Sequence, residues 1–459
     1  MLKASSVLCL TRVEPLRTKG CRGRPFKDWA RCIDHWTDQS IVHCLDQRPH
    51  CSFCPGFVVL SGFTKFVALI LISLLWALNA QESLAQNKQV TLMNETLRFA
   101  GPHVNTSDQV SQELQFSYAL SGLNWRDGPL ASSSGTANPQ GQTLSNASLI
   151  VQKNTGFFQY LVQAGSYALS TLGSQLDAVK PLEKNSFGPI PHAYISLNPN
   201  EEWSLQVGKL LSMPGFENPF SFQNQNIQRG LLENQNNTIS QGLQLNYAKD
   251  KVTLFGTWND GFYSGQLSWL GLGGSYQFND HHSTNVMLGW AHKPSQVSTD
   301  VTPLLQNNSQ IINLVHRMQW GSWSLTPYYQ LTLIPSNATT QLANPARTQG
   351  YAVILDYSLP DLTSLGLPQG STFHIPLRLE HLKVSDYNAL NAQHLVFGPN
   401  TQVSSWTLTP TLQSGMYFLR GEWSRYSVRN NSNMNANASV PVDPKKPPMR
   451  FLLEWGVLY

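Results

Sequence analysis

Between residue 111 and the C-terminus, apolar and polar side chains alternate in one segment after another, each 8 to 14 residues long. In one of them, Trp323, Leu325 and Tyr329 alternate with Ser324, Thr326 and Gln330. Successive side chains of an extended strand point to opposite faces, so each segment would have one apolar and one polar face. Because this region also lacks a long apolar stripe with helical spacing, it favours an all-β fold.

Sixteen such segments can be drawn as strands, at residues 111–120, 145–152, 155–168, 190–198, 203–210, 238–248, 251–259, 265–278, 284–292, 309–320, 323–332, 348–359, 371–383, 403–412, 416–425 and 449–459. Long and short connections alternate between them, and only 260–264 and 360–370 break the alternation. A sheet that crosses a membrane must close on itself, with short turns at one rim and long loops at the other. The sequence therefore predicts a transmembrane antiparallel up-and-down β-barrel of about 16 strands, with 14 or 18 acceptable, whose first connection, 121–144, is external.

Composition excludes several other classes. Charged residues make up 13% of the chain and hydrophobic residues 41%, and the hydrophobic residues are dispersed. This excludes a polytopic helical membrane protein and a highly charged disordered chain. Residues 1–85 hold ten of the 31 basic and six of the 27 acidic residues, which leaves 21 of each in residues 86–459. A neutral body gives no support for a nucleic-acid partner.

The N-terminal region differs from the rest. All six cysteines lie between Cys9 and Cys54. Residues 63–85 contain a lysine, an apolar run from Phe66 to Leu78 and small residues at the end. This pattern predicts a secretory signal peptide cut between Ala85 and Gln86, and a retained membrane anchor is the alternative.

The predicted cleavage site also determines how the remaining segments are interpreted. Residues 1–62 are interpreted as an over-long start or a disordered extension. The alternative for them is a small metal-binding knuckle around His50, Cys51 and Cys54. Residues 86–110 would be a periplasmic segment and residues 111–459 the transmembrane barrel.

Aromatic residues gather at the ends of the predicted strands, as expected for side chains at a membrane interface. The periplasmic rim would hold Trp203, Tyr247, Phe278, Trp320, Trp323 and Tyr357. The external rim would hold Trp258, Tyr263, Trp290, Trp406 and Trp423.

The last predicted strand has the most specific motif. Phe451, Leu453, Trp455, Val457 and Tyr459 occupy every second position up to the chain end. The pattern resembles the C-terminal assembly signal of bacterial outer-membrane proteins, with Tyr459 in place of the more usual phenylalanine. It implies a Gram-negative outer-membrane location and recognition by the barrel-assembly machinery.

Three central motifs resemble the outer-membrane β-barrel porins called OmpL-like. They are Gly208-Lys209, the segment GFENPFSFQNQNIQRGLLENQNN from Gly215 to Asn237, and WNDGFYS from Trp258 to Ser264. The similarity is closest over residues 190–292 and extends loosely over most of the mature chain. It implies passive diffusion of small solutes and gives no catalytic residues to carry over.

Charged residues on the polar faces and in one long connection are candidates for the pore lining. They are Arg229, Glu233, Arg317, Asp356, His374, Arg378, Glu380, Arg420, Glu422, Arg450 and Glu454. They could form a charged pore wall that orients solutes, or cross-strand ion pairs that tie the wall together. Lys209, by contrast, shares its face with apolar residues, so either it snorkels at the outer rim or Gly208 marks a bulge.

The connection 211–237 is the longest, at 27 residues, and is rich in amides and aromatics. Sixteen strands leave a lumen too wide for side chains alone to fill. We therefore expect this connection to fold into the lumen and narrow the pore. An ordinary surface loop is the alternative.

No enzyme, cofactor or metal site is expected. His192 and His374 have no Ser or Asp partner at a diagnostic spacing, and no GxSxG, HExxH or P-loop motif occurs. Three functions remain: a general porin, a substrate-selective channel, and a closed barrel that acts as a structural anchor or adhesin. The expected partners are outer-membrane lipid and small solutes, and the sequence leaves open whether the barrel forms a homo-oligomer.

Overall fold

A computed structural model of the chain describes residues 97–98, 114–128, 140–174, 176, 186–213, 215–299, 301–342, 344–359, 362–384, 397, 400–430 and 449–459. The chain divides into two units, Met1–Val67 and Ala68–Tyr459, and all of the described residues belong to the second. The interpretations of residues 1–62 and of the signal peptide at 63–85 concern residues outside the described part. The same is true of most of the segment 86–110.

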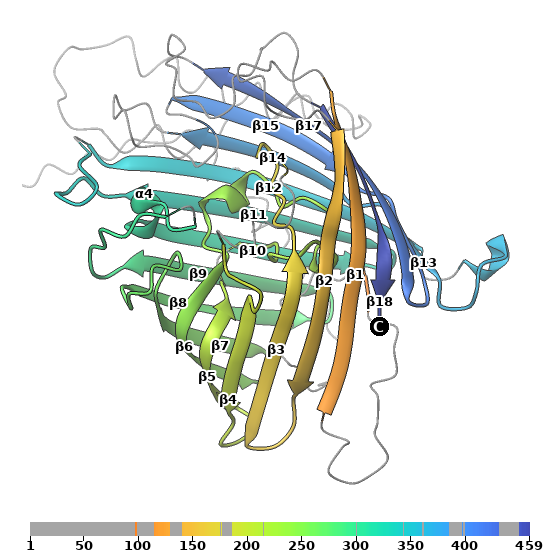
Figure 1. Cartoon of the computed structure of the whole chain (residues 1–459), viewed down its shortest axis with the longest axis horizontal. Coiled ribbons are helices and arrows are strands. Elements are labelled where there is room, and N and C mark those ends of the chain that lie inside the picture. Colours follow the sequence, from red (N-terminus) through yellow and green to blue (C-terminus); the bar gives the residue numbers. More distant parts are fainter. Residues whose placement is uncertain are drawn as a thin grey trace, which may run out of the picture. The chain divides into compact units, whose positions relative to one another are not determined.

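Eighteen antiparallel strand segments form a single sheet (Figure 1). They are β1 (Leu114–Asp127), β2 (Gln140–Lys153), β3 (Phe158–Tyr167), β4 (His192–Leu197), β5 (Trp203–Leu211), β6 (Ile239–Lys249), β7 (Val252–Asn259), β8 (Trp269–Asn279), β9 (His282–Ala291), β10 (Gln310–Trp320), β11 (Trp323–Ile334), β12 (Ala346–Leu359), β13 (Thr372–His374), β14 (Leu377–Val384), β15 (Thr401–Leu408), β16 (Thr411–Ser414), β17 (Tyr417–Asn430) and β18 (Met449–Leu458). Each segment pairs with its neighbours around the barrel, and β1 pairs with both β2 and β18, so the sheet closes into a barrel.

Two of the barrel strands are interrupted at a proline. β13 and β14 both pair with β12 and are separated by Ile375 and Pro376. β15 and β16 both pair with β17 and are separated by Thr409 and Pro410. Proline has no backbone N–H to donate, so the hydrogen-bond ladder breaks there. The 18 segments therefore make 16 barrel strands, and the predicted antiparallel barrel is confirmed.

Several strand boundaries differ from the prediction, and the first connection differs most. β1 extends to Asp127 and β2 begins at Gln140, so the predicted loop 121–144 shrinks to residues 128–139. The alternation was hidden there by a register shift between Ser121 and Gly122. The predicted external link 260–264 lengthens to 260–268, because Tyr263, at φ 57°, and Gly265, at φ 69°, take left-handed backbone conformations and delay the next strand.

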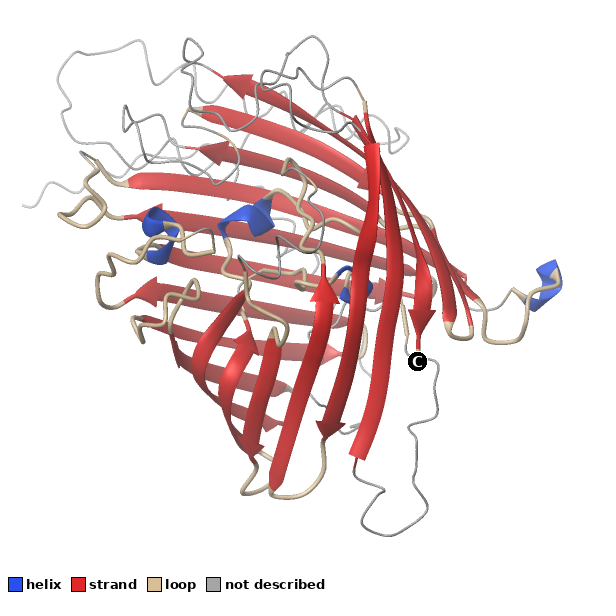
Figure 2. Ribbon diagram, in the orientation of Figure 1, coloured by secondary structure: helices blue, strands red, loops and turns tan. Residues whose placement is uncertain are grey.

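Short helices lie in the connections (Figure 2). They are η2 (Ser221–Gln223), η3 (Leu232–Gln235), α4 (Leu304–Asn307) and η4 (Thr363–Leu365). Within the described part of the chain, none of the helices has the length and apolar character needed to span a membrane.

The outward face of the barrel is apolar along its middle. Val207, Leu254 and Leu272 are 50%, 49% and 53% exposed, as suits side chains that face lipid. At the rim with short turns, Trp203 packs on Tyr247 of the next strand, with 4.8 Å between ring centroids. Both residues were predicted to lie at the periplasmic rim, and this contact agrees with that prediction.

Lys209 of β5 lies on this outward face. Its Nζ donates to the carbonyl oxygens of Phe187 and Ile190, both at 2.9 Å. Gly208 pairs with Tyr194 and Gly242 without a register shift. The structure therefore supports snorkelling at the outer rim and not a bulge.

Candidate functional site

Residues 215–237, between β5 and β6, lie inside the barrel, and we call this segment the lumen loop. It contains η2 and η3. Nearly all of its side chains are buried, its backbone contacts inward-facing residues of β14 and β17, and the Ser221 hydroxyl donates to Glu454 of β18. Of the two interpretations of the connection 211–237, the structure supports the folded lumen loop and not a surface loop.

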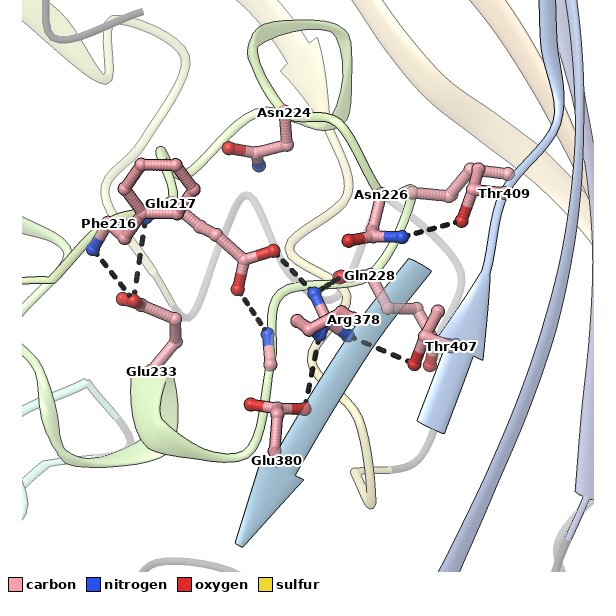
Figure 3. A network of polar contacts seen from close by, with 12 residues as sticks. Phe216, Glu217, Asn224, Asn226, Gln228, Glu233, Arg378, Glu380, Thr407 and Thr409 are labelled. Carbon is pink, nitrogen blue, oxygen red and sulfur yellow. Dashed lines mark hydrogen bonds and ion pairs between the residues drawn. The ribbon is translucent and has the colours of Figure 1, made fainter. Parts of the chain in front are cut away.

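Arg378 of β14 is the first anchor of the lumen loop (Figure 3). Its side chain is fully buried and forms ion pairs with Glu217 of the loop and with Glu380, whose Oε2 lies 3.1 Å from the Arg378 Nε. Its Nη1 also donates to the carbonyl oxygen of Gln228 at 2.8 Å, and its Nη2 donates to Thr407 Oγ1 at 3.3 Å. The guanidinium therefore joins the loop to two wall strands.

The same carboxylates accept hydrogen bonds from the loop backbone. Gly230 N–H donates to Glu217 at 2.6 Å, and Leu231 N–H donates to Glu380 at 2.7 Å. The backbone of an irregular segment must find partners when it leaves water. Here the carboxylates of Glu217 and Glu380 are those partners.

Glu422 of β17 is the second anchor. Its Oε2 accepts the N–H of Ile227 at 2.6 Å, and its Oε1 accepts the side-chain amide of Gln228 at 2.9 Å. Thr409 Oγ1 also donates to Glu422 and itself accepts the Asn226 amide at 2.7 Å. The Glu422 carboxylate is therefore bound by N–H and O–H donors, most of them from the lumen loop, and not by a basic side chain.

The Arg420 and Glu454 pair, on β17 and β18, is the third anchor. Arg420 Nη1 and Nη2 donate to the carbonyl oxygens of Asn224 and Ser221, at 2.9 and 3.0 Å. Glu454 accepts the hydroxyls of Ser221 and Ser145, both at 2.7 Å. Both charged residues are fully buried.

An excess of carboxylates surrounds the first anchor. Glu217, Glu233 and Glu380 face the guanidiniums of Arg229 and Arg378. Burial raises the pKa of Glu217 to about 8, although Arg378 opposes the shift, and burial also raises the pKa of Glu233. Three ionised carboxylates against two cations would leave a net charge in a dry region, so retention of one proton is favoured.

The other predicted pore-lining residues are also engaged. His374 Nδ1 lies 2.9 Å from Asp356 Oδ2, and Arg450 Nε lies 2.6 Å from Asp127 Oδ1. The Arg317 guanidinium lies over the Phe216 ring of the lumen loop, 5.3 Å from its centroid. For His374, Asp356 and Arg450 the geometry favours the ion-pair interpretation over the charged pore wall, whereas Arg317 contacts the lumen loop through an aromatic ring.

The sequence did not predict several contacts inside the barrel. Residues 168–174 also turn inward, where Leu172 N–H donates to the Arg229 carbonyl at 2.8 Å and Arg229 N–H donates to that of Ser170 at 3.0 Å. Arg98 N–H donates to Gln413 Oε1, on the inward face of β16, at 2.8 Å. The Asp356 partner of His374 was missed because it lies on another strand. No spacing rule in one sequence indicates such contacts.

The opposite half of the wall is different. On β5 to β9 the inward face is uncharged: small and amide side chains lie beside the buried Phe255, Trp269 and Met287, and Gln206, Asn246 and Ser275 remain partly accessible. A pocket lies between this half and the end of the lumen loop, lined in part by Gln244 and Asn237. None of the inward-facing residues of β5 to β9 is charged.

The C-terminal motif lies on the outward face of β18. Trp455 is 55% exposed. The Tyr459 ring stacks on that of Tyr118, with centroids 5.2 Å apart, and their backbones exchange two hydrogen bonds of 2.8 and 3.0 Å. The last residue thus closes the barrel against β1.

No group of three or more His, Cys, Asp or Glu side chains within the described ranges is placed to hold a metal ion. The inward-facing carboxylates contact guanidiniums, hydroxyls and amides, as described above.

Comparison with known proteins places the chain in a family. The family profile described as "Putative beta-barrel porin-2, OmpL-like" matches residues 116–453, about three quarters of the sequence, and the chain belongs to this family. No curated protein matches it. The barrel is therefore a porin of the outer membrane, a channel for small solutes.

Solved structures of bacterial porins resemble the chain in fold. The anion-selective porin from Comamonas acidovorans has 10% identity and a TM-score of 0.49, over 75% of this chain and 99% of that one. The outer membrane channel DcaP of Acinetobacter baumannii has 11% identity and a TM-score of 0.45, over 75% and 96%. OprD of Pseudomonas aeruginosa has 10% identity and a TM-score of 0.44, over 76% and 95%.

Proposed function

We propose that small polar solutes diffuse passively between the lumen loop and the inward faces of β5 to β9, and that the lumen loop is a fixed constriction. The observation that supports this path is the one-sided anchoring of the loop. Its bonds to charged residues of the wall run to β14, β17 and β18, and single hydrogen bonds join it to Asn146 of β2 and Gln330 of β11. At its end, Asn237 also donates to the Gly261 carbonyl oxygen in the connection after β7. The accessible amide and hydroxyl side chains lie on the other half of the wall.

The charge of the path follows from the same division. Gln206, Asn246 and Ser275 can exchange hydrogen bonds with water and with solutes, and they add no charge. The inward-facing Arg378 and Arg420 are fully buried and paired. We therefore propose a channel with weak ion selectivity, in which a passing solute meets no fixed charge on β5 to β9.

A closed barrel that acts as a structural anchor or adhesin is the second candidate. The nearly complete burial of the lumen loop favours it. So does the bond from Arg98 N–H to Gln413 on the inner wall. A substrate-selective channel would differ from both by a flux that saturates.

Conductance in planar bilayers separates these functions. The wild-type protein should form steady channels, and the flux of a small neutral sugar into proteoliposomes should rise linearly with concentration. No conductance from folded, heat-modifiable protein would favour the closed barrel. Saturating flux would favour the substrate-selective channel.

Export and assembly complete the proposal. The chain would be cut between Ala85 and Gln86, and the strand that ends at Tyr459 would be recognised by the barrel-assembly machinery. The stacking of Tyr459 on Tyr118 supports a role in closure. Deletion of Tyr459 should reduce heat-modifiable folded protein without reducing synthesis, whereas normal folding of the variant would contradict this role. No enzymatic activity is proposed.

A further inference from the structure

Basic side chains lie on the outward faces of β12, β14 and β17, which are three of four adjacent strands, near the rim that bears the long connections. These residues, which we call the basic patch, are Arg347 of β12, His381 and Lys383 of β14, and Arg425 and Arg429 of β17. They alternate along the chain with buried inward-facing residues such as Glu380, Leu382 and Tyr426. The basic patch therefore lies on the membrane side of the wall and is separate from the lumen.

Strand register brings the basic patch together. Lys383 pairs with Gln402 of β15, and Gln402 pairs with Arg429. Lys383 and Arg429 are thus two strand spacings apart, about 10 Å between Cα atoms. One residue pair further from the rim, His381 Nδ1 lies 3.0 Å from Ser404 Oγ. Long cationic side chains at this spacing can converge on a single anionic group.

Acidic partners are missing from the outward face. The 18 strands contain five acidic residues, Asp127, Asp356, Glu380, Glu422 and Glu454. All five face inward, in ion pairs or hydrogen bonds described above. Among the described residues, no carboxylate lies within ion-pair distance of Lys383, Arg425 or Arg429. Arg347 donates to Gln349 at 2.7 Å.

The absence of acidic residues from the outward faces of the strands also indicates what kind of partner fits the basic patch. A second copy of the chain would bring no acidic side chain on the outward faces of its described strands. Trp406 pairs with Arg425 of the basic patch, and Trp423 lies two residues further from the rim, and aromatic residues of this kind gather where a barrel meets a membrane interface. The patch is therefore at the height of lipid headgroups in the outer leaflet.

We propose that the basic patch binds the phosphate groups of an anionic lipid of the outer leaflet. Arginine matches phosphate geometry with two parallel N–H donors, and lysine adds a point charge. Each basic residue near an anionic membrane surface adds to the attraction. His381 and Ser404 add polar groups beside the phosphate site.

The test measures binding of bisphosphorylated lipid A to detergent-purified full-length barrel by native mass spectrometry. The variant K383Q/R425Q/R429Q removes three charges from the patch. The matched control, K153Q/K249Q/K251Q, removes three charges at the opposite rim, where these lysines contact turns. Heat modifiability confirms folding of both. We expect at least about tenfold weaker binding for the patch variant, a nearly unchanged control, and weak binding of dephosphorylated lipid A by every form.

Other outcomes would overturn the proposal. Equal binding by the patch variant and the control would show that the patch has no special role. Equal binding of phosphorylated and dephosphorylated lipid would exclude phosphate recognition. An oligomer in lipid-free detergent that dissociates only in the patch variant would identify the patch as an interface between copies of the chain.

Discussion

The two halves of the barrel wall use polar residues in opposite ways. On β14 to β18, the inward face carries charged side chains that are buried and bonded to the lumen loop, as Arg378, Glu422 and Glu454 illustrate, beside neutral hydroxyls and amides. On β5 to β9 they are neutral and partly accessible. A charge on the inner wall of a barrel is therefore not by itself evidence of a pore lining, because buried charges can serve to hold a loop.

Removal of the lumen loop should have the largest effect on this asymmetry. Replacement of residues 218–235 by a short Gly-Ser linker opens the lumen beside β14 to β18, so single-channel conductance should rise severalfold while the barrel stays folded. Shortening of the turn around η4, where Leu365 is 74% exposed, is the control and should change nothing. Unchanged conductance in the loop variant would mean that the loop does not obstruct the path.

Substitution of Arg378 by Met should have the next largest effect. It leaves Glu217 and Glu380 as buried carboxylates without their cation, at a cost of roughly 3–5 kcal/mol. We expect a lower temperature of heat modification and noisy, flickering channels. R126Q, which removes an exposed, outward-facing arginine of β1 outside the basic patch, should behave as wild type. A quiet and equally stable R378M channel would show that the ion pairs do not hold the loop.

Introduction of charge on the accessible half should have a moderate effect. Gln206→Glu places a carboxylate beside the proposed path, so the reversal potential in a salt gradient should shift toward cation preference. The control Gln402→Glu, on an outward face, should give no shift. If neither variant shifts the potential, solutes do not pass along β5.

The smallest expected effect is a pH dependence of loop docking. Burial raises the pKa of Glu217 from 4.5 to about 8 in the folded barrel. The stabilisation that comes from the retained proton is complete below about pH 4.5 and is lost as the pH rises through about 8. Channel noise should therefore increase between pH 6 and pH 9, and Glu217→Gln should abolish the increase. Equal noise over this range in the wild type would contradict the shift.

The sequence predicted the wall of the barrel well. Alternation and loop parity yielded 16 strands because lipid on one side and a wet lumen on the other impose a strict period of two. The errors lie where that period is disturbed, at the register shift beside Gly122 and at the left-handed residues Tyr263 and Gly265. Pro376 and Pro410 interrupt strands without changing their direction, so they did not disturb the strand count.

The interior was less predictable. Strand parity placed Arg378, Arg420 and Glu422 on the inner face, but it could not indicate whether water or a loop would face them. That depends on contacts between residues far apart in the chain, such as Glu217 with Arg378 or Ser221 with Glu454. Polar composition is compatible with both outcomes, because amides and hydroxyls bind water and backbone equally well.

Accessibility of introduced cysteines tests the central claim most directly, since the chain has no cysteine after Cys54. Single substitutions Gln206→Cys and Ser275→Cys lie on the proposed path, and Thr407→Cys and Ser424→Cys lie behind the lumen loop, where the native side chains are 0% and 1% exposed. With a small charged methanethiosulfonate reagent added to open channels, the first two should react quickly and reduce the current, and the last two should stay unlabelled. Equal labelling of all four, or labelling of Thr407→Cys and Ser424→Cys alone, would contradict a path along β5 to β9.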